Sequence, residues 1–84
     1  MPKIAKIKPG IYEHYKGKRY EVMGVAHHSE TLEAVVVYKA LYETKWGKTS
    51  WWVRPFTMFT SQVLVDGKSV PRFRYVRRKI TSKN

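Results

Sequence analysis

The residues most suited to chemistry lie together in one short stretch, His27-His28-Ser29-Glu30. Imidazoles and a carboxylate can bind a metal or transfer protons, and a serine near a histidine can act as a nucleophile. The alternative is a polar turn between two strands, in which Ser29 and Thr31 bond to nearby backbone N–H groups. The spacing of these residues decides which interpretation is favoured.

The spacing supports neither a metal centre nor a nucleophilic site. Zinc needs three or four ligands in a tetrahedral array, whereas adjacent histidines of an extended chain point to opposite faces. A zinc site would need His14, one histidine of the pair and a carboxylate such as Glu30. Serine catalysis would need Ser29 to meet His14 across the fold, and the chain has no Gly-x-Ser-x-Gly motif. We therefore expect no catalytic residue, metal or cofactor, and we favour binding over enzymatic activity.

A ligand pocket is a more specific interpretation of the same stretch. Five side chains would converge if the turn folds over the neighbouring strands: His28, Glu30, Tyr38, Trp52 and Arg54. An aromatic wall, an arginine and a His/Glu pair suit a small anionic or nucleotide-like ligand. The competing interpretation is a structural ion pair between Arg54 and Glu30 or Glu33 that holds the turn, with the aromatic residues packed in the core.

The charge distribution favours a different kind of partner. The chain carries a net charge of +11, of which residues 1–19 contribute +5 and residues 68–84 contribute +7, whereas residues 20–67 contribute −1. A basic domain of this kind favours a polyanionic partner, RNA or DNA before a membrane surface, and the alternative is that the charge only keeps the protein soluble. In an extended segment Arg72 and Arg74 would share one face, and cations of the first hairpin would extend that row. The predicted phosphate contacts are Lys16, Lys18, Arg19, Arg72, Arg74, Arg77 and Arg78.

Two tryptophans suggest a third binding mode. Residues 43–50 are polar and predict an exposed loop, which carries Trp46 and ends beside Trp51. Because tryptophan anchors many protein interfaces, this segment is consistent with a protein-interaction adaptor.

Composition limits the remaining classes. The chain has 84 residues, the size of one small domain, and its 12 aromatic residues predict an aromatic core. It has no cysteine, which excludes disulfides and thiolate metal sites. No apolar run approaches the roughly 20 residues of a membrane span, and the stretch MPKIAKIKPG lacks the apolar segment of a secretory signal. We expect a cytoplasmic protein without a membrane span.

Short strands separated by turns must position these residues. The turn Lys16-Gly17-Lys18 predicts a hairpin of strands 11–15 and 19–26. The β-branched and aromatic residues of 34–42 predict a central strand, which follows a turn at 27–33.

The second half of the chain predicts shorter elements. Pro55 ends a strand at 51–54, and one helical turn is expected at 56–61. The dipeptide Asp66-Gly67 predicts a tight turn that pairs strand 62–65 with strand 70–75.

Five to six short strands with one helical turn predict an all-β domain over residues 1–76, followed by a flexible basic tail, 77–84. Closing the sheet would remove its exposed edges, so we predict a small SH3-like barrel, with an OB-like barrel as the alternative.

Six motifs resemble a family of small bacterial proteins that is known only as a domain of unknown function. In order they are HYKG at 14–17, HSET at 28–31, VVY at 36–38, WVRP at 52–55, MF at 58–59 and PRF at 71–73. The resemblance extends over about residues 8–75 and implies a bacterial, single-domain, cytosolic protein. It implies no reaction, ligand or partner, and neither the tail nor the loop at 43–51 belongs to it.

Overall fold

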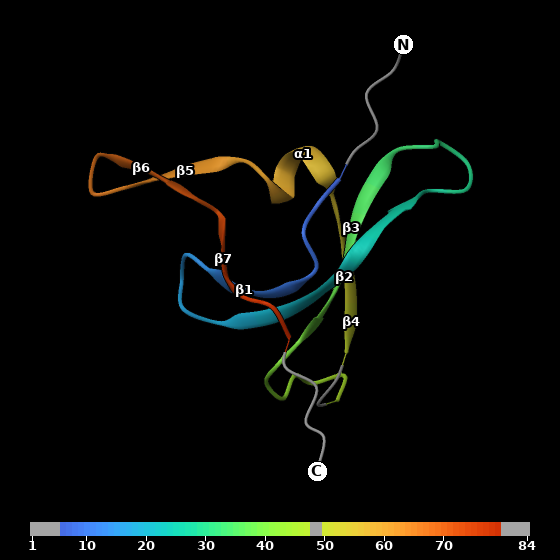
Figure 1. The fold of residues 1–84 in the computed structure, drawn as a ribbon, viewed down its shortest axis with the longest axis horizontal. Coiled ribbons are helices and arrows are strands. Elements are labelled where there is room, and N and C mark those ends of the chain that lie inside the picture. The colour runs from blue at the N-terminus through green and yellow to red at the C-terminus, as the bar shows by residue number, and fades with distance from the viewer. Residues whose placement is uncertain (1–5, 48–49, 80–84) are drawn as a thin grey trace.

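The computed structural model describes residues 6–47 and 50–79, and within them the chain forms two antiparallel sheets and one short helix (Figure 1). The larger sheet has the strand order β4-β3-β2-β1-β7, and β5 pairs with β6 in the smaller one. The predicted all-β class is therefore confirmed. The elements are β1 (Gly10–His14), β2 (Arg19–His27), β3 (Ala34–Ala40), β4 (Trp51–Pro55), α1 (Phe56–Phe59), β5 (Gln62–Val65), β6 (Lys68–Pro71) and β7 (Phe73–Arg77).

The larger sheet does not close into the barrel that we expected. Within the described residues, β4 and β7 are its two edges and do not pair with each other. The core is covered by α1, which packs against β3 and β4, so the apolar face is buried without closure of the sheet. Within the same residues no helix is long and apolar enough to cross a membrane.

The two faces of the larger sheet differ in character, because alternate residues of a strand point to opposite sides. We call the face that carries Tyr12, Val22, Tyr38 and Phe73 the core face, since these side chains form the buried cluster beneath α1. The opposite face carries the intervening residues, among them the charged pairs described below, and we call it the outer face.

The core face is aromatic, as the composition predicted. Phe59 of α1 is 1% exposed and stacks on Phe73, with ring centroids 3.9 Å apart. Tyr12 and Tyr38 contact the ring of Phe59 at centroid distances of 5.7 and 5.3 Å. This cluster joins α1 to three different strands, so it fixes the side chains that border it.

The predicted strand 70–75 is wrong, because the chain bends at Arg72 and divides it between the two sheets. Pro71 has no N–H with which to continue the β5–β6 ladder. At the bend, the Arg72 N–H donates to the Ser61 carbonyl and the Arg72 carbonyl accepts from the Tyr15 N–H, both at 2.9 Å. Burial of Phe73 then places β7 beside β1.

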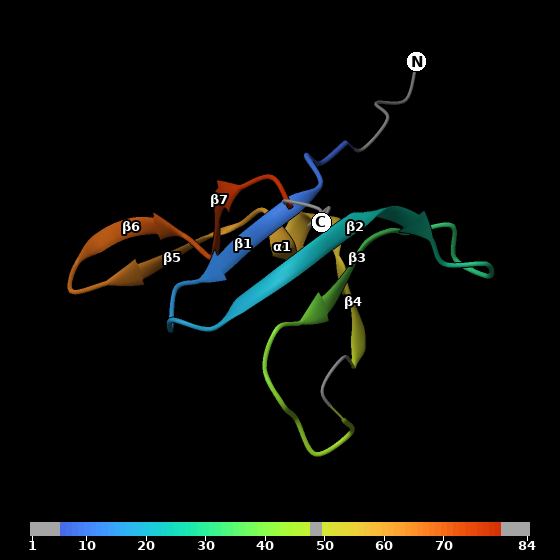
Figure 2. The same cartoon turned by 60° about the horizontal axis from the view of Figure 1, so that its bottom comes forward.

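The predicted turn at Asp66-Gly67 is confirmed. Its two residues have φ angles of 52° and 78°, the conformation that a two-residue hairpin turn requires and that this dipeptide adopts readily. The resulting β5–β6 hairpin projects from the fold on the same side as the β1–β2 turn in Figure 1 and Figure 2.

Candidate functional site

The stretch around His28 forms the polar turn that the sequence suggested. The His28 Nδ1 accepts from the backbone N–H groups of Glu30 and Thr31, at 3.2 and 3.4 Å, and Thr31 Oγ1 accepts from the Glu33 N–H at 3.2 Å. Leu32 has a φ of 64°, which reverses the chain. Within residues 6–47 and 50–79, no group of three histidine or acidic side chains is placed to hold a metal ion.

Three of the five predicted pocket residues lie together on the core face. The Arg54 Nε donates to the Tyr38 hydroxyl at 3.2 Å, and Trp52 lies opposite Tyr38 in the register of β3 and β4. His28 and Glu30 belong instead to the turn beyond the end of β2 and β3. Across the described residues neither Glu30 nor Glu33 forms an ion pair with Arg54, so the predicted structural pair is not formed.

A second arginine and a histidine join Arg54 at the border of the aromatic cluster. The Arg54 guanidinium lies over the ring of Phe73, 5.4 Å from its centroid, and the His14 ring meets the same phenylalanine at 4.9 Å. Arg72, at the bend before β7, donates from its Nε to the Ser61 hydroxyl at 3.1 Å. Both arginines are half-buried, and neither pairs with a carboxylate in the part of the chain that the structure describes.

His14 is a neutral member of this cationic group. Burial lowers the pKa of its imidazole, and the charges of Arg54, Lys16 and Arg72 lower that pKa further. The Nδ1 atom accepts from the Lys16 N–H at 3.1 Å, which leaves the ring proton on Nε2. The charges of three cations therefore act on one uncharged imidazole, and we name Arg54, Arg72, Lys16 and His14 the cationic cluster.

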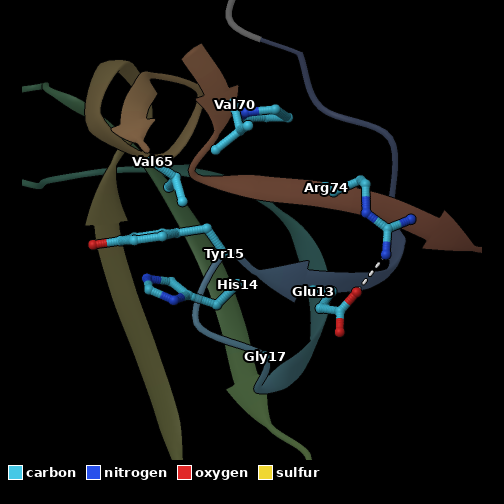
Figure 3. A pocket seen from close by; sticks show the side chains of 8 residues that line it. Glu13, His14, Tyr15, Gly17, Val65, Val70 and Arg74 are labelled. Carbon is cyan, nitrogen blue, oxygen red and sulfur yellow. Dashed lines mark hydrogen bonds and ion pairs between the residues drawn. The ribbon is translucent and has the colours of Figure 1, made fainter. Parts of the chain in front are cut away.

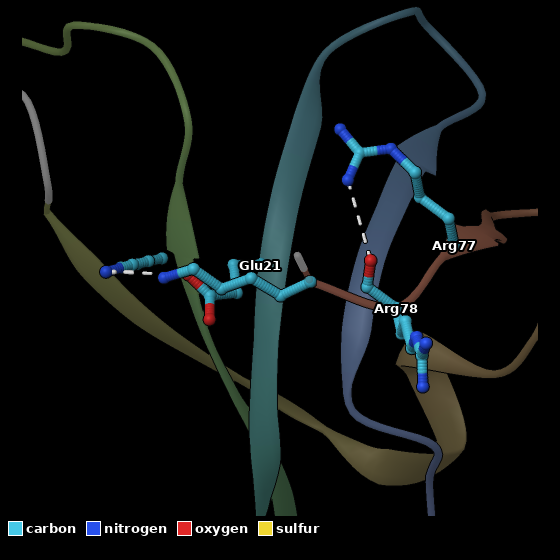
Figure 4. A network of polar contacts seen from close by, with 5 residues as sticks. Glu21, Arg77 and Arg78 are labelled. Carbon is cyan, nitrogen blue, oxygen red and sulfur yellow. Dashed lines mark hydrogen bonds and ion pairs between the residues drawn. The ribbon is translucent and has the colours of Figure 1, made fainter. Parts of the chain in front are cut away.

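The predicted phosphate contacts do not form one row. Arg19 and Arg74 lie on the outer face, where both are opposite Glu13 in the register, and Arg74 forms an ion pair with that carboxylate. Arg77 is exposed and donates to the carbonyl of Arg78 at 3.5 Å (Figure 4).

The remaining predicted cations lie near the core face. Lys16 and Lys18 are exposed in the β1–β2 turn. Their ammonium groups lie over the rings of Tyr15 and Tyr42, 5.9 and 4.6 Å from the centroids. Together with Arg72, which turns toward Ser61 at the end of α1, they form the subset of the predicted contacts that the structure places at the border of the core face.

The outer face holds a carboxylate that is surrounded by lysines. The side chain of Glu21 is only 9% exposed, and its Oε1 lies 3.1 Å from Lys79 Nζ and 3.5 Å from Lys39 Nζ (Figure 4). These contacts are ion pairs without hydrogen-bond geometry. Lys79 thus connects the segment after β7, which we expected to be a flexible tail, to β2.

Sequence reasoning missed two parts of this region. It considered His14 only as a metal ligand or serine partner, although the alternation of β1 places it with Tyr12 on the core face. It also missed the pair of Tyr20 and Tyr42, whose hydroxyls lie 2.6 Å apart. Burial and this hydrogen bond raise the pKa of the Tyr20 hydroxyl.

The two tryptophans of the adaptor hypothesis do not share a surface. Trp46 is 65% exposed and meets Trp52 edge to face at 5.3 Å, whereas Trp51 is 59% exposed on the outer face of β4. A single partner would need to contact the loop and the outer face together, which weakens this hypothesis.

Comparison with known proteins assigns the chain to a family. The model of DUF1653, a protein family of unknown function, matches residues 10–75. No curated protein matches the sequence. A crystal structure of a DUF1653 protein from Bordetella bronchiseptica is 36% identical, with a TM-score of 0.77, and the match covers 90% of this chain and 95% of that one. The chain therefore belongs to the DUF1653 family.

Proposed function

We propose that this protein binds nucleic acid through the phosphate backbone, and that Arg54, Arg72, Lys16 and Lys18 make the phosphate contacts. The observation that carries the proposal is the burial of the two arginines, Arg54 and Arg72, together with the kind of partner that each one has. Both are half-buried, both give one N–H to a neutral hydroxyl, and neither meets a carboxylate within the described residues. Withdrawing a charge from water is unfavourable unless an opposite charge is supplied, and a phosphate would supply it.

The electrostatics of the cationic cluster support the same proposal. The cations around His14 oppose its protonation, which indicates a positive potential at this point of the surface. An anion offsets that potential, and arginine is well suited to phosphate because its planar group donates two parallel hydrogen bonds. Lys16 and Lys18 extend the positive surface onto the β1–β2 turn, where both residues are exposed.

The structural alternative is that the arginines only cover the aromatic core. Arg54 packs over Phe73, and such a cation–π contact stabilises a fold by about 0.5–1 kcal/mol at exposed sites. A core role predicts that replacing Arg54 changes stability without changing nucleic-acid affinity. The two interpretations therefore differ in a measurable quantity.

The test is fluorescence anisotropy of labelled RNA and DNA of mixed sequence at about 50 and 200 mM salt. Four phosphate contacts predict a loss of affinity on the order of 10²-fold across this range. The variant Arg54→Gln/Arg72→Gln should bind about 10- to 100-fold more weakly, with a salt slope that is smaller by about two contacts. The matched control, Arg19→Gln/Arg77→Gln, removes the same charge from exposed residues outside the cationic cluster and should change affinity by less than about threefold.

Equal losses in the two double variants would overturn the assignment of contacts, because binding would then follow net charge alone. Absence of binding at 50 mM salt would overturn the proposed function. Thermal unfolding of each variant shows whether a loss of affinity reflects a loss of fold.

A second candidate function is the binding of a small anionic ligand at the same cluster. The specific observation is that Arg54 and His14 contact the same ring, that of Phe73, while Arg54 and Arg72 have no carboxylate partner within the described residues. Inorganic phosphate at millimolar concentration should then stabilise the protein against heat, and Arg54→Gln should remove the effect.

A further inference from the structure

A cavity of about 380 Å³ lies next to the cationic cluster, between the β1–β2 turn and the β5–β6 hairpin (Figure 3). Its volume falls within the range of small-molecule sites, roughly 300–1,000 Å³. Neither the sequence motifs nor the proposed phosphate contacts account for it. The lining residues are Glu13, His14, Tyr15, Gly17, Val65, Val70, Pro71 and Arg74.

The walls of this cavity suit a flat, partly apolar group. The rings of His14 and Tyr15 lie 4.6 Å apart with an angle of 33° between them, and they form one side. Val65 of β5 and Val70 of β6 form the side facing Tyr15 (Figure 3). Tyr15 is 39% exposed although it is aromatic, so part of its ring is available for stacking.

Polar groups are placed at one end of the cavity. The ion pair between Glu13 and Arg74 lies there and presents a carboxylate beside a guanidinium (Figure 3). A carboxylate accepts hydrogen bonds from the amino groups of bases, and a guanidinium donates to their ring nitrogens and carbonyls. The cavity therefore combines an aromatic wall, an apolar wall and a polar end that can pair with the edge of a base.

The cavity and the cationic cluster share a residue and a hydrogen bond. His14 lines the cavity and also contacts the ring of Phe73, over which the Arg54 guanidinium lies. The backbone N–H of Tyr15 donates to the carbonyl of Arg72 at 2.9 Å, so the stacking residue and the phosphate-binding residue are held side by side. A nucleotide whose base enters the cavity would place its phosphate at the cationic cluster.

We infer that the cavity receives an unpaired base of single-stranded nucleic acid, stacked on Tyr15, while the cationic cluster holds the adjacent phosphates. This inference rests on the proposed function and deepens it by naming the form of nucleic acid. A base inside a duplex is stacked and paired, so it reaches the cavity only after an unfavourable extrusion. The protein therefore prefers single strands to duplexes.

The experiment measures the affinity of the full chain for a single-stranded oligonucleotide, for its duplex and for an abasic strand of the same length. The single strand should bind on the order of 10-fold more tightly than either of the other two. Tyr15→Ala should weaken binding of the single strand by about 10-fold and leave the other two affinities nearly unchanged, whereas Tyr15→Phe retains the ring and the affinity. The matched control is Trp51→Ala, which removes an exposed aromatic ring from the outer face.

A second variant guards against a loss of fold in Tyr15→Ala. Val65→Trp keeps an apolar side chain in the wall and fills the cavity, and it should abolish the preference for single strands. Equal affinity for single strand and duplex, or unchanged affinity in both Tyr15→Ala and Val65→Trp, would overturn the inference. If binding in that case still depends on salt and is weakened by Arg54→Gln/Arg72→Gln, the proposed function is retained and only the base pocket is wrong. If no oligonucleotide binds at low salt, both fall.

Discussion

The two faces of the larger sheet use the same types of charged residue in different ways. On the outer face three cations meet carboxylates, since Arg74 pairs with Glu13, and Lys39 and Lys79 both lie near Glu21. On the core face Arg54 and Arg72 donate to hydroxyl groups, and within the described residues neither pairs with a carboxylate. The charges of the outer pairs therefore have opposite charges beside them within the fold, whereas the core-face arginines retain N–H groups for an external anion.

This difference shows that net charge alone does not locate a binding surface. The seven residues proposed from the sequence as phosphate contacts all carry a positive charge. The structure places only some of them at the border of the core face. A carboxylate in an ion pair cancels much of the electric field of its cation. Whether an arginine can attract an external anion therefore depends on whether it already has such a partner. The comparison predicts that the faces will respond differently to mutation, and the largest difference concerns stability.

The first prediction contrasts aromatic residues of the two sides. Phe59→Ala should lower the free energy of unfolding by about 3–5 kcal/mol, because Phe59 is 1% exposed and joins α1 to the sheet through Phe73. Trp51→Ala, on the outer face and 59% exposed, should change it by less than about 0.5 kcal/mol. Urea denaturation followed by circular dichroism measures both. Similar losses in the two variants would contradict the assignment of the core to the side of the sheet that α1 covers.

The same contrast separates what the sequence could predict of the fold from what it could not. Local patterns identified the all-β class, the β1–β2 hairpin and the Asp66-Gly67 turn, since each depends on residues close in the chain. The division of segment 70–75 at Arg72 depends on Ser61 and Tyr15, which are distant in sequence. Closure of the sheet also depends on tertiary packing, because α1 covers the core in place of further strand pairing.

The candidate site was predictable only in part, for a related reason. The alternation of β4 favours Arg54 and Trp52 on one face, and both lie there beside Tyr38. The turn of His28 was placed near Arg54 by proximity of motifs, but its hydrogen bonds are local and hold it at the end of the hairpin. No local pattern reveals the cavity, because it forms between two hairpins that are far apart in the chain.

The second prediction concerns the outer-face carboxylate. Glu21→Gln should lower the free energy of unfolding by about 1–2 kcal/mol, because it removes a buried charge that faces Lys39 and Lys79. The control is Glu30→Gln in the exposed turn, for which we expect a change within about 0.5 kcal/mol. Nucleic-acid affinity should be retained in both variants. A Glu21→Gln variant of unchanged stability would show that the lysines only screen the carboxylate.

The third and smallest effect tests the core face through its histidine. The pKa of His14 is lowered in the folded protein, chiefly by burial and then by Arg54, Lys16 and Arg72. Below the unfolded value of about 6.5, the unfolded chain therefore binds more protons than the folded one, and stability falls as the pH decreases from there through the folded pKa. His14→Gln should reduce this slope, as measured by urea denaturation between pH 5 and 7.

Binding of phosphate groups should oppose the lowering of the His14 pKa by the charges of Arg54, Lys16 and Arg72. An anion between Arg54 and Arg72 favours the imidazolium, so the pKa of His14, followed by NMR, should rise when an oligonucleotide is added. By linkage, affinity then increases as the pH falls through the interval between the free and bound values. Arg19→Gln, on the outer face, should leave this rise intact, whereas Arg54→Gln should reduce it. If the pKa of His14 does not change when the oligonucleotide is added, the phosphates bind elsewhere. The functional distinction between the two faces would then be wrong.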